Sequence, residues 1–147
     1  MKRRGLQIRP IHRRWLYSVS LLLFISGASW AWISHLDENG QAGESLRRLK
    51  TRLIAVHGFA AVTFVFLFGT LLVTHVRRAW HARKNRWNGG FFLITAGLLT
   101  VSGYALYYLS DEKSRAANSQ FHLWLGLVSP ALLVWHILSG RKSIMRD

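Results

Sequence analysis

Uncharged, strongly apolar stretches alternate with charged segments along the 147-residue chain. Four stretches contain no Asp, Glu, Lys or Arg: 15–35, 53–76, 91–110 and 120–140. Each has roughly 20 residues, the length that an α-helix needs to cross ~30 Å of hydrocarbon. None shows the polar face that a surface helix of a soluble protein presents. The pattern predicts an all-α integral membrane protein whose single domain, residues 1–147, is a four-helix bundle with four spans.

The chain combines 50% hydrophobic residues with a formal net charge of +14, and the placement of the charge explains this combination. Fourteen of the twenty basic residues lie before the first span, between the second and third, and after the fourth, together with one acid, Asp147. The other two connections carry six basic and five acidic residues. Because basic residues concentrate in cytoplasmic loops, both termini are predicted to be cytoplasmic and the bundle to run up-down-up-down. A nucleic-acid-binding surface would not explain this asymmetry.

The first span follows a basic segment, as the apolar part of a signal peptide does. Its apolar run is too long for a signal peptide and no Ala-x-Ala-like site closes it, so we expect it to be retained. The chain has no cysteine. This excludes disulfides, iron–sulfur clusters and covalently attached c-type haem.

Four of the seven histidines lie within the second and fourth spans. His57 and His75 are 18 residues apart, and His122 and His136 are 14 apart. At ~100° per residue, 18 steps return to the same helix face and 14 steps miss it by about 40°. The second and fourth helices of an up-down bundle run parallel. His57 is therefore expected to face His122 near the outer surface, and His75 to face His136 near the inner one.

Two opposed imidazoles are the ligands that six-coordinate haem iron takes in a bundle core. Zinc or copper held by imidazoles alone would leave the metal charge uncompensated inside lipid, whereas haem brings a dianionic macrocycle. We therefore expect two haem b groups, with iron ligands His57, His122, His75 and His136. For any one intramembrane histidine, a hydrogen bond to a neighbouring helix is the alternative explanation.

The ligands of the inner site stay open. The histidine pairs are separated by ~21 Å along the fourth helix and ~27 Å along the second. Helix tilts of ~20° could absorb this difference. Otherwise His12, before the first span, could replace His75, and His35, at the end of that span, could serve the outer site. Both could also be ordinary interfacial residues.

Glycine and proline positions bear on the same sites. Gly58 follows His57, and Gly126 lies one turn after His122, where a missing side chain would admit a flat macrocycle. The alternative is that these glycines only permit close helix packing. Pro130 is expected to kink the fourth helix and free a carbonyl.

Two segments resemble the four-helix dihaem cytochrome b proteins, including the subunits that serve formate dehydrogenases and nickel–iron hydrogenases. They are FHLWLGLVSPALLVWHILSGR, with its 14-residue histidine spacing, and VHGFAAVTFVFLFGTLLVTHVRR. The segment IRPIHRRWLYSVSLLLFISG is similar to the first helix of those families, where a histidine near the cytoplasmic end is a haem ligand. This similarity implies that His12 pairs with His136 in place of His75. The chain departs from the family in the 18-residue spacing and in the two arginines between His12 and Trp15.

The resemblance implies electron transfer between the quinone pool and an outer partner, a periplasmic cytochrome or flavoprotein. It also implies a multi-pass protein of the bacterial inner membrane that works within a complex, contacts quinone and has no independent enzymatic activity. One alternative is a haem-free structural or assembly subunit. Another is a small transporter with histidine proton relays, which the absence of Asp, Glu, Lys and Arg from the spans disfavours.

Overall fold

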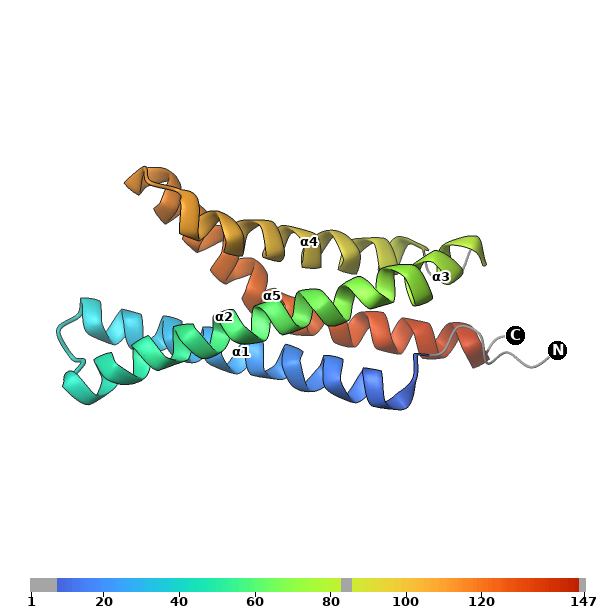
Figure 1. Cartoon of the computed structure of the whole chain (residues 1–147), viewed down its shortest axis with the longest axis horizontal. Helices are drawn as coiled ribbons and strands as arrows, with labels where there is room; N and C mark the ends of the chain where they lie inside the picture. Colours follow the sequence, from blue (N-terminus) through green and yellow to red (C-terminus); the bar gives the residue numbers. More distant parts are fainter. Residues whose placement is uncertain (1–7, 83–85, 146–147) are drawn as a thin grey trace.

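The computed structural model describes residues 8–82 and 86–145, and side chains as far as residue 140. The regular elements of these residues are all helical, which confirms the predicted fold class (Figure 1). They are α1 (Pro10–Glu38), α2 (Glu44–Leu71), the π-helical turn η2 (Leu72–Val76), α3 (Arg77–His81), α4 (Arg86–Tyr108) and α5 (Glu112–Met145). α2, η2 and α3 follow one another without a break. Four helices within the described residues are long and apolar enough to cross a membrane: Pro10–Glu38, Glu44–His81, Arg86–Tyr108 and Glu112–Gly140.

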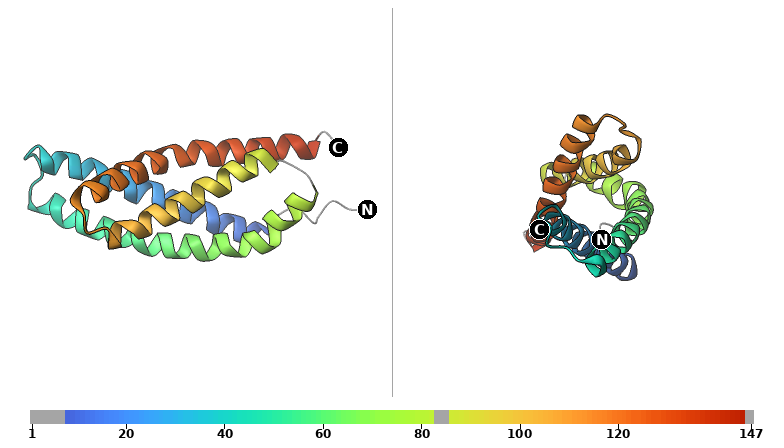
Figure 2. Two further views of the ribbon diagram at one scale, coloured as in Figure 1. Left: turned by 90° about the horizontal axis from the view of Figure 1, so that it is seen from above. Right: turned by 90° about the vertical axis from the view of Figure 1, so that its left-hand side faces the viewer.

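The helices form two antiparallel hairpins. α1 packs along α2, α4 packs along α5, and the two hairpins meet chiefly where α1 contacts α5. Figure 2 shows the hairpins side by side along the long axis of the molecule. α1 begins and α5 ends at one end, here called the terminal end, where α3 also leads to α4. The connections 39–43 and 109–111 lie at the opposite end, here called the distal end.

The helices extend well beyond the uncharged stretches. The segments 36–52 and 77–90 were expected to be connecting loops, and most of both is helical. The expectation was wrong because charge marks the edge of the hydrocarbon, not the end of a helix, and Arg and Lys are good helix formers. At the distal end, Asp37 accepts hydrogen bonds from Arg47 at 2.9 Å and Lys50 at 3.2 Å. Gly40 takes the turn there with a φ of 71°, which favours glycine.

α5 continues as a helix through Pro130. Proline has no N–H, so the carbonyl of Gly126, four residues earlier, loses its helical donor. The Ser129 hydroxyl donates to that oxygen at 2.8 Å. The carbonyl that the sequence predicted to be freed is thus satisfied within α5.

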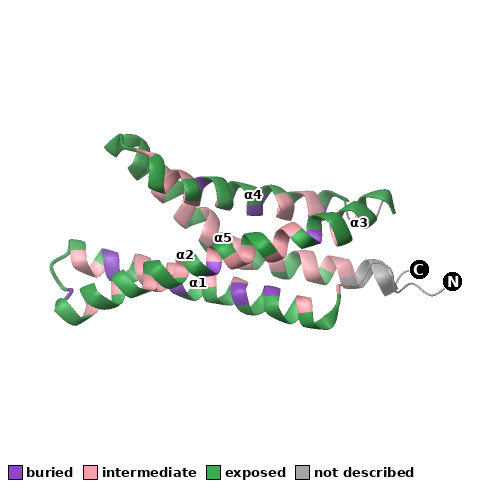
Figure 3. Cartoon of the chain, viewed as in Figure 1, coloured by how far each residue is buried: buried purple, intermediate pink, exposed green. Residues whose placement is uncertain are grey.

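Side-chain burial is that of a membrane helix bundle. The buried positions are mostly small, such as Ser26, Ala60, Ala96 and Ser102, and small residues let helices approach closely in lipid. Many large apolar side chains are exposed, and most of the ribbon in Figure 3 has the colours of exposed or intermediate residues. Phe59, for example, is 76% exposed. Soluble proteins rarely expose so continuous an apolar surface, whereas lipid solvates it favourably. The fold therefore fits a membrane environment.

Candidate functional site

Two histidines in the distal half of the bundle face each other across it. His57 of α2 and His122 of α5 have ring centroids 6.3 Å apart, with their planes at 81°. Two metal–nitrogen bonds of about 2 Å, plus about 1.1 Å from each nitrogen to its ring centre, give a separation of about 6 Å. Two imidazole planes that share a nitrogen–metal–nitrogen axis can stand at any angle to each other, so the observed 81° is compatible with such an axis. The separation of the two rings therefore fits a pair of axial ligands on one iron.

The neighbouring hairpin helix fixes the protonation of each ring. Nδ1 of His57 lies 3.0 Å from the Ser26 hydroxyl, and Nδ1 of His122 lies 2.9 Å from the Ser102 hydroxyl. Each serine already donates its one proton to a backbone carbonyl, of Leu22 or of Leu98, at 2.7 Å. With that proton donated to the carbonyl, each serine oxygen is left to accept, which assigns the imidazole proton to Nδ1. The lone pair is left on Nε2, the nitrogen that would bind a metal.

A glycine makes room for each ring. A Cβ atom at Gly27 would lie 3.0 Å from Cε1 of His57, and one at Gly103 would lie 3.1 Å from Cε1 of His122. Ordinary contacts between carbon atoms are about 3.5–4 Å. Any side chain at these two positions would push the imidazole out of place. The close approach of backbone to ring therefore requires glycine at both.

The two distal histidines are thus built in the same way. Each is held by a Ser-Gly pair on the partner helix of its hairpin, residues 26–27 on α1 and 102–103 on α4. Asn88-Gly89 on α4 repeats the arrangement for His136. The sequence shows no apparent internal repeat, and the contacts of Ser26, Ser102 and Asn88 with the histidines were not predicted from it. The signal was present, since Asn88 precedes Ser102 by 14 residues, the spacing between His122 and His136.

The site at the terminal end centres on His136 of α5. Its Nδ1 donates to Oδ1 of Asn88 at 2.7 Å, so its lone pair is also on Nε2. The ring of Phe92 stacks on it at 5.4 Å with an interplanar angle of 11°. His75 lies at the same end of the bundle, on the π-helical turn η2 that continues α2. Such turns inside α-helices occur frequently at functional sites.

Asn88 also carries a buried donor with no partner. The residue is 8% exposed, and its Nδ2 is one of two buried side-chain nitrogen or oxygen atoms without a hydrogen-bond partner in the described part of the chain. The other is the Ser34 hydroxyl of α1. An unsatisfied buried donor costs about 1–3 kcal/mol. The contact of its Oδ1 with Nδ1 of His136 offsets part of this cost.

His12 and His35 are not brought to a second imidazole by any contact of the described residues. Nε2 of His12 lies 3.2 Å from the Leu67 carbonyl and 3.3 Å from the Thr70 hydroxyl, both on α2. A carbonyl only accepts, so Nε2 of His12 is protonated and has no lone pair for a metal. His35 is exposed and lies 3.3 Å from Nδ2 of Asn39 through its Nε2.

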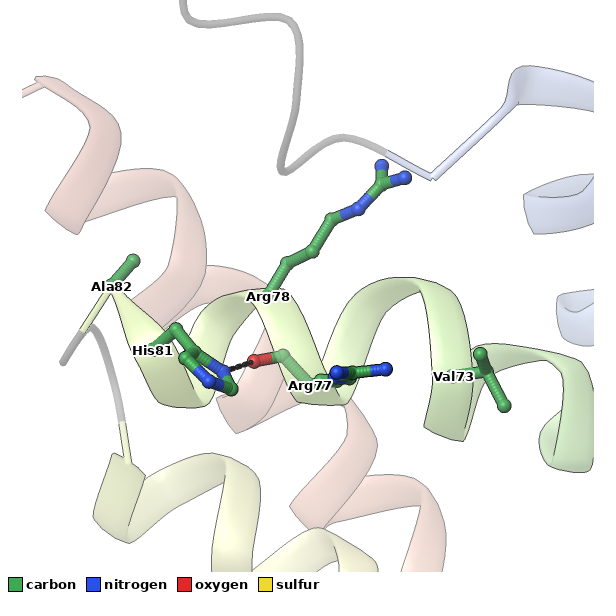
Figure 4. Close-up of a pocket in the computed structure, with 5 residues that line it drawn as sticks. All are labelled: Val73, Arg77, Arg78, His81 and Ala82. Atoms are coloured by element: carbon green, nitrogen blue, oxygen red, sulfur yellow. Dashed lines mark hydrogen bonds between the residues drawn. The ribbon is translucent and has the colours of Figure 1, made fainter.

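His81 lies at an open hollow on the surface of the terminal end. The hollow is lined by Val73, Arg77, Arg78, His81 and Ala82. Figure 4 shows the His81 ring turned toward its own helix, where Nδ1 donates to the Arg77 carbonyl at 2.7 Å. His81 is exposed and takes no part in the histidine pairs.

The glycines expected to admit a macrocycle have other neighbours. A Cβ at Gly58 would meet the Tyr107 hydroxyl at 3.5 Å, and one at Gly126 would meet Leu99 at 3.9 Å. Both distances are ordinary contacts. The glycines with a demonstrable steric role are instead Gly27 and Gly103.

Within the described residues, no three His, Cys, Asp or Glu side chains come together as they would around zinc. His57 and His122 form a pair, and two imidazoles are what a six-coordinate haem iron takes from a protein. No protein-family model, no curated protein and no solved structure matches the chain. The argument for function therefore depends on the geometry of these histidines.

Proposed function

We propose that the chain is a dihaem b-type cytochrome that carries electrons across a membrane. The observation that supports this most is the distal pair, His57 and His122. Their separation of 6.3 Å suits one iron between them, and both have Nδ1 bonded to serine so that Nε2 is free to ligate. When bound, haem iron accepts and releases one electron by alternating between its ferric and ferrous forms.

The second haem is assigned to the terminal end, between His136 and His75. His136 has the Nδ1 contact that leaves its lone pair on Nε2, and His75 lies at the same end of the bundle on the π-helical turn η2. His12 is the weaker candidate because its Nε2 donates to the α2 backbone. The π-helical turn also winds more residues into one turn, which shortens the ~27 Å expected between His57 and His75.

Two centres stacked along the bundle would form a route through the insulating core. They lie ~21 Å apart along α5, from the 14 residues between its histidines. Aromatic rings occupy part of the intervening space: Phe68 of α2 meets Phe92 of α4 at 6.3 Å, and Phe92 stacks on His136. We propose that electrons pass between the quinone pool and a periplasmic cytochrome or flavoprotein. The proposed setting is a complex in the bacterial inner membrane, with both termini cytoplasmic.

The test is the spectrum of protein purified from haem-replete cells. Reduction should give the Soret and α bands of low-spin haem b, with about two haems per chain by pyridine haemochrome assay. His122→Ala and His136→Ala should each remove one haem, since each deletes one of two axial ligands. His81→Ala is the matched control, because that ring is exposed and bonds to its own helix.

His75→Ala and His12→Ala separate the two candidates for the last ligand. We expect loss of one haem from the first variant and two retained haems in the second. A folded, colourless native protein would contradict the proposal. That result would leave the haem-free structural subunit, whose histidines only hydrogen-bond between helices.

A further inference from the structure

Three residues outside the ligand set contact the histidines in one common way. Ser26 accepts from Nδ1 of His57, Ser102 from Nδ1 of His122, and Asn88 from Nδ1 of His136. We propose that Ser26, Ser102 and Asn88 are positioning residues that fix the ligand tautomers and lower the reduction potentials of the haems. Asn88 is assigned the largest effect. The inference rests on the proposed function and adds the residues that tune it.

The first part of the argument is orientation. Ser26 and Ser102 are 1% and 5% exposed, and each hydroxyl is held by its bond to the preceding turn. A fixed acceptor at Nδ1 and the glycine backbone close to the neighbouring Cε1 confine each imidazole to a narrow range of rotation. Asn118 strengthens one of these contacts by donating to the Ser102 carbonyl at 2.9 Å, which joins α5 to α4 one turn before His122.

The second part is electronic. An N–H that donates to an oxygen leaves more electron density on the imidazole and makes Nε2 a stronger base. A more basic ligand stabilises ferric iron over ferrous iron, because the ferric ion carries the higher charge. Each acceptor should therefore lower the potential of the haem whose ligand it contacts.

The three acceptors are not equal. The serine hydroxyls accept while donating to a carbonyl, at 2.9–3.0 Å from the imidazole nitrogen. The amide oxygen of Asn88 is the better acceptor and lies at 2.7 Å. The shorter contact indicates the stronger hydrogen bond. Removal of Asn88 should therefore raise a potential more than removal of either serine.

The experiment is a spectroelectrochemical titration of the purified holoprotein and its variants. Removing such a partner typically costs a metal site about tenfold in affinity or more. If the loss falls on the ferric form, a tenfold change raises the potential by about 59 mV for one electron. We expect Ser26→Ala and Ser102→Ala to shift the same haem upward, and Asn88→Leu to shift the other haem further.

Two controls distinguish tuning from packing. Ser20→Ala removes a hydroxyl that makes the same bond to the preceding turn, at 2.8 Å to the Leu16 carbonyl, but has no hydrogen bond to an imidazole among the described residues. Its potentials should equal those of the native protein. Asn88→Asp keeps an acceptor and adds negative charge, so it should lower the potential. A residue that only packed would not give shifts of opposite sign with Leu and Asp.

The outcomes separate this inference from the proposed function. A native protein without haem would overturn both. Two haems whose potentials in Ser26→Ala, Ser102→Ala and Asn88→Leu match those of Ser20→Ala would overturn the tuning role alone. If Ser102→Ala loses one haem, Ser102→Thr, which retains the hydroxyl, should restore it while circular dichroism shows unchanged helix content. Failure of the threonine variant to restore that haem would count against the positioning role.

Discussion

Gly103→Ala tests the geometry of the distal site with the smallest change that the chain allows. The added methyl would lie 3.1 Å from Cε1, 3.7 Å from Nδ1 and 3.9 Å from Nε2 of His122. The ring must move by a few tenths of an ångström to reach an ordinary contact of about 3.5 Å or more. Its Nδ1 is held at 2.9 Å by Ser102, so the movement also strains that hydrogen bond.

The expected magnitude follows from known costs of overpacking. An extra methyl in a well-packed site costs about 1–3 kcal/mol. A loss of about 2 kcal/mol from one ligand site corresponds to a fall in haem affinity of about 30-fold. Haem titration of the apoprotein, read from the reduced α band, measures this. The haem at the terminal end should be unaffected and serves as an internal reference.

Gly97→Ala is the matched control on the same helix. Nothing lies within 4 Å of a Cβ placed there. Alanine is the better helix former by up to about 1 kcal/mol, so this variant should be as stable as the native protein or more stable. Gly27→Ala should repeat the Gly103→Ala result through His57, where the contact is 3.0 Å. Native haem affinity in both Gly27→Ala and Gly103→Ala would refute the argument.

Two further predictions concern stability. Ser129→Ala should destabilise the protein by about 1 kcal/mol, because the Gly126 carbonyl, which Pro130 leaves without a helical donor, then loses its hydrogen bond. Thermal unfolding in detergent measures this loss, and an unchanged midpoint would contradict the prediction. The pKa of Asp111 lies below its usual value because the Ser114 side chain and backbone N–H both donate to its carboxylate. This contribution at the start of α5 is complete above the usual carboxyl pKa of about 4 and is lost as the pH falls through the lowered pKa. Asp111→Asn should therefore unfold at a lower temperature than the native protein at pH 6, and the gap should close on acidification through and below pH 4; a constant gap would refute the linkage.

The amino-acid sequence alone was enough for the fold class. Four uncharged stretches of sufficient length specify four membrane helices, because hydrocarbon tolerates neither bare charges nor unpaired backbone groups. The distribution of basic residues predicted an orientation that stays a prediction. Helical periodicity put the two histidines of each span near one helix face, the parallel course of the second and fourth helices then matched His57 with His122, and the structure places these two rings together. Periodicity can predict a shared face because the angle between two side chains on one helix depends only on their separation in the sequence.

Tertiary structure decided what surrounds those rings. Ser26 and His57 are 31 residues apart, and Asn88 and His136 are 48 apart, so their contacts depend on how two helices are aligned within a hairpin. No local pattern encodes that alignment. A serine or asparagine within an apolar helix looks the same in the sequence whether it bonds to its own backbone or to a ligand.

The sequence left His12 and His75 as alternatives for the inner site, and the structure adds an observation on each of them. The spacing argument compared helices of constant rise, whereas α2 passes through a π-helical turn at residues 72–76 just where His75 lies. His12 meanwhile donates to the Leu67 carbonyl of the same helix. The residues that could serve as ligands were identifiable from the sequence, because the chemistry of the histidine side chain alone makes them candidates. Which nitrogen each ring presents, and to what, depended on packing between helices distant in the chain.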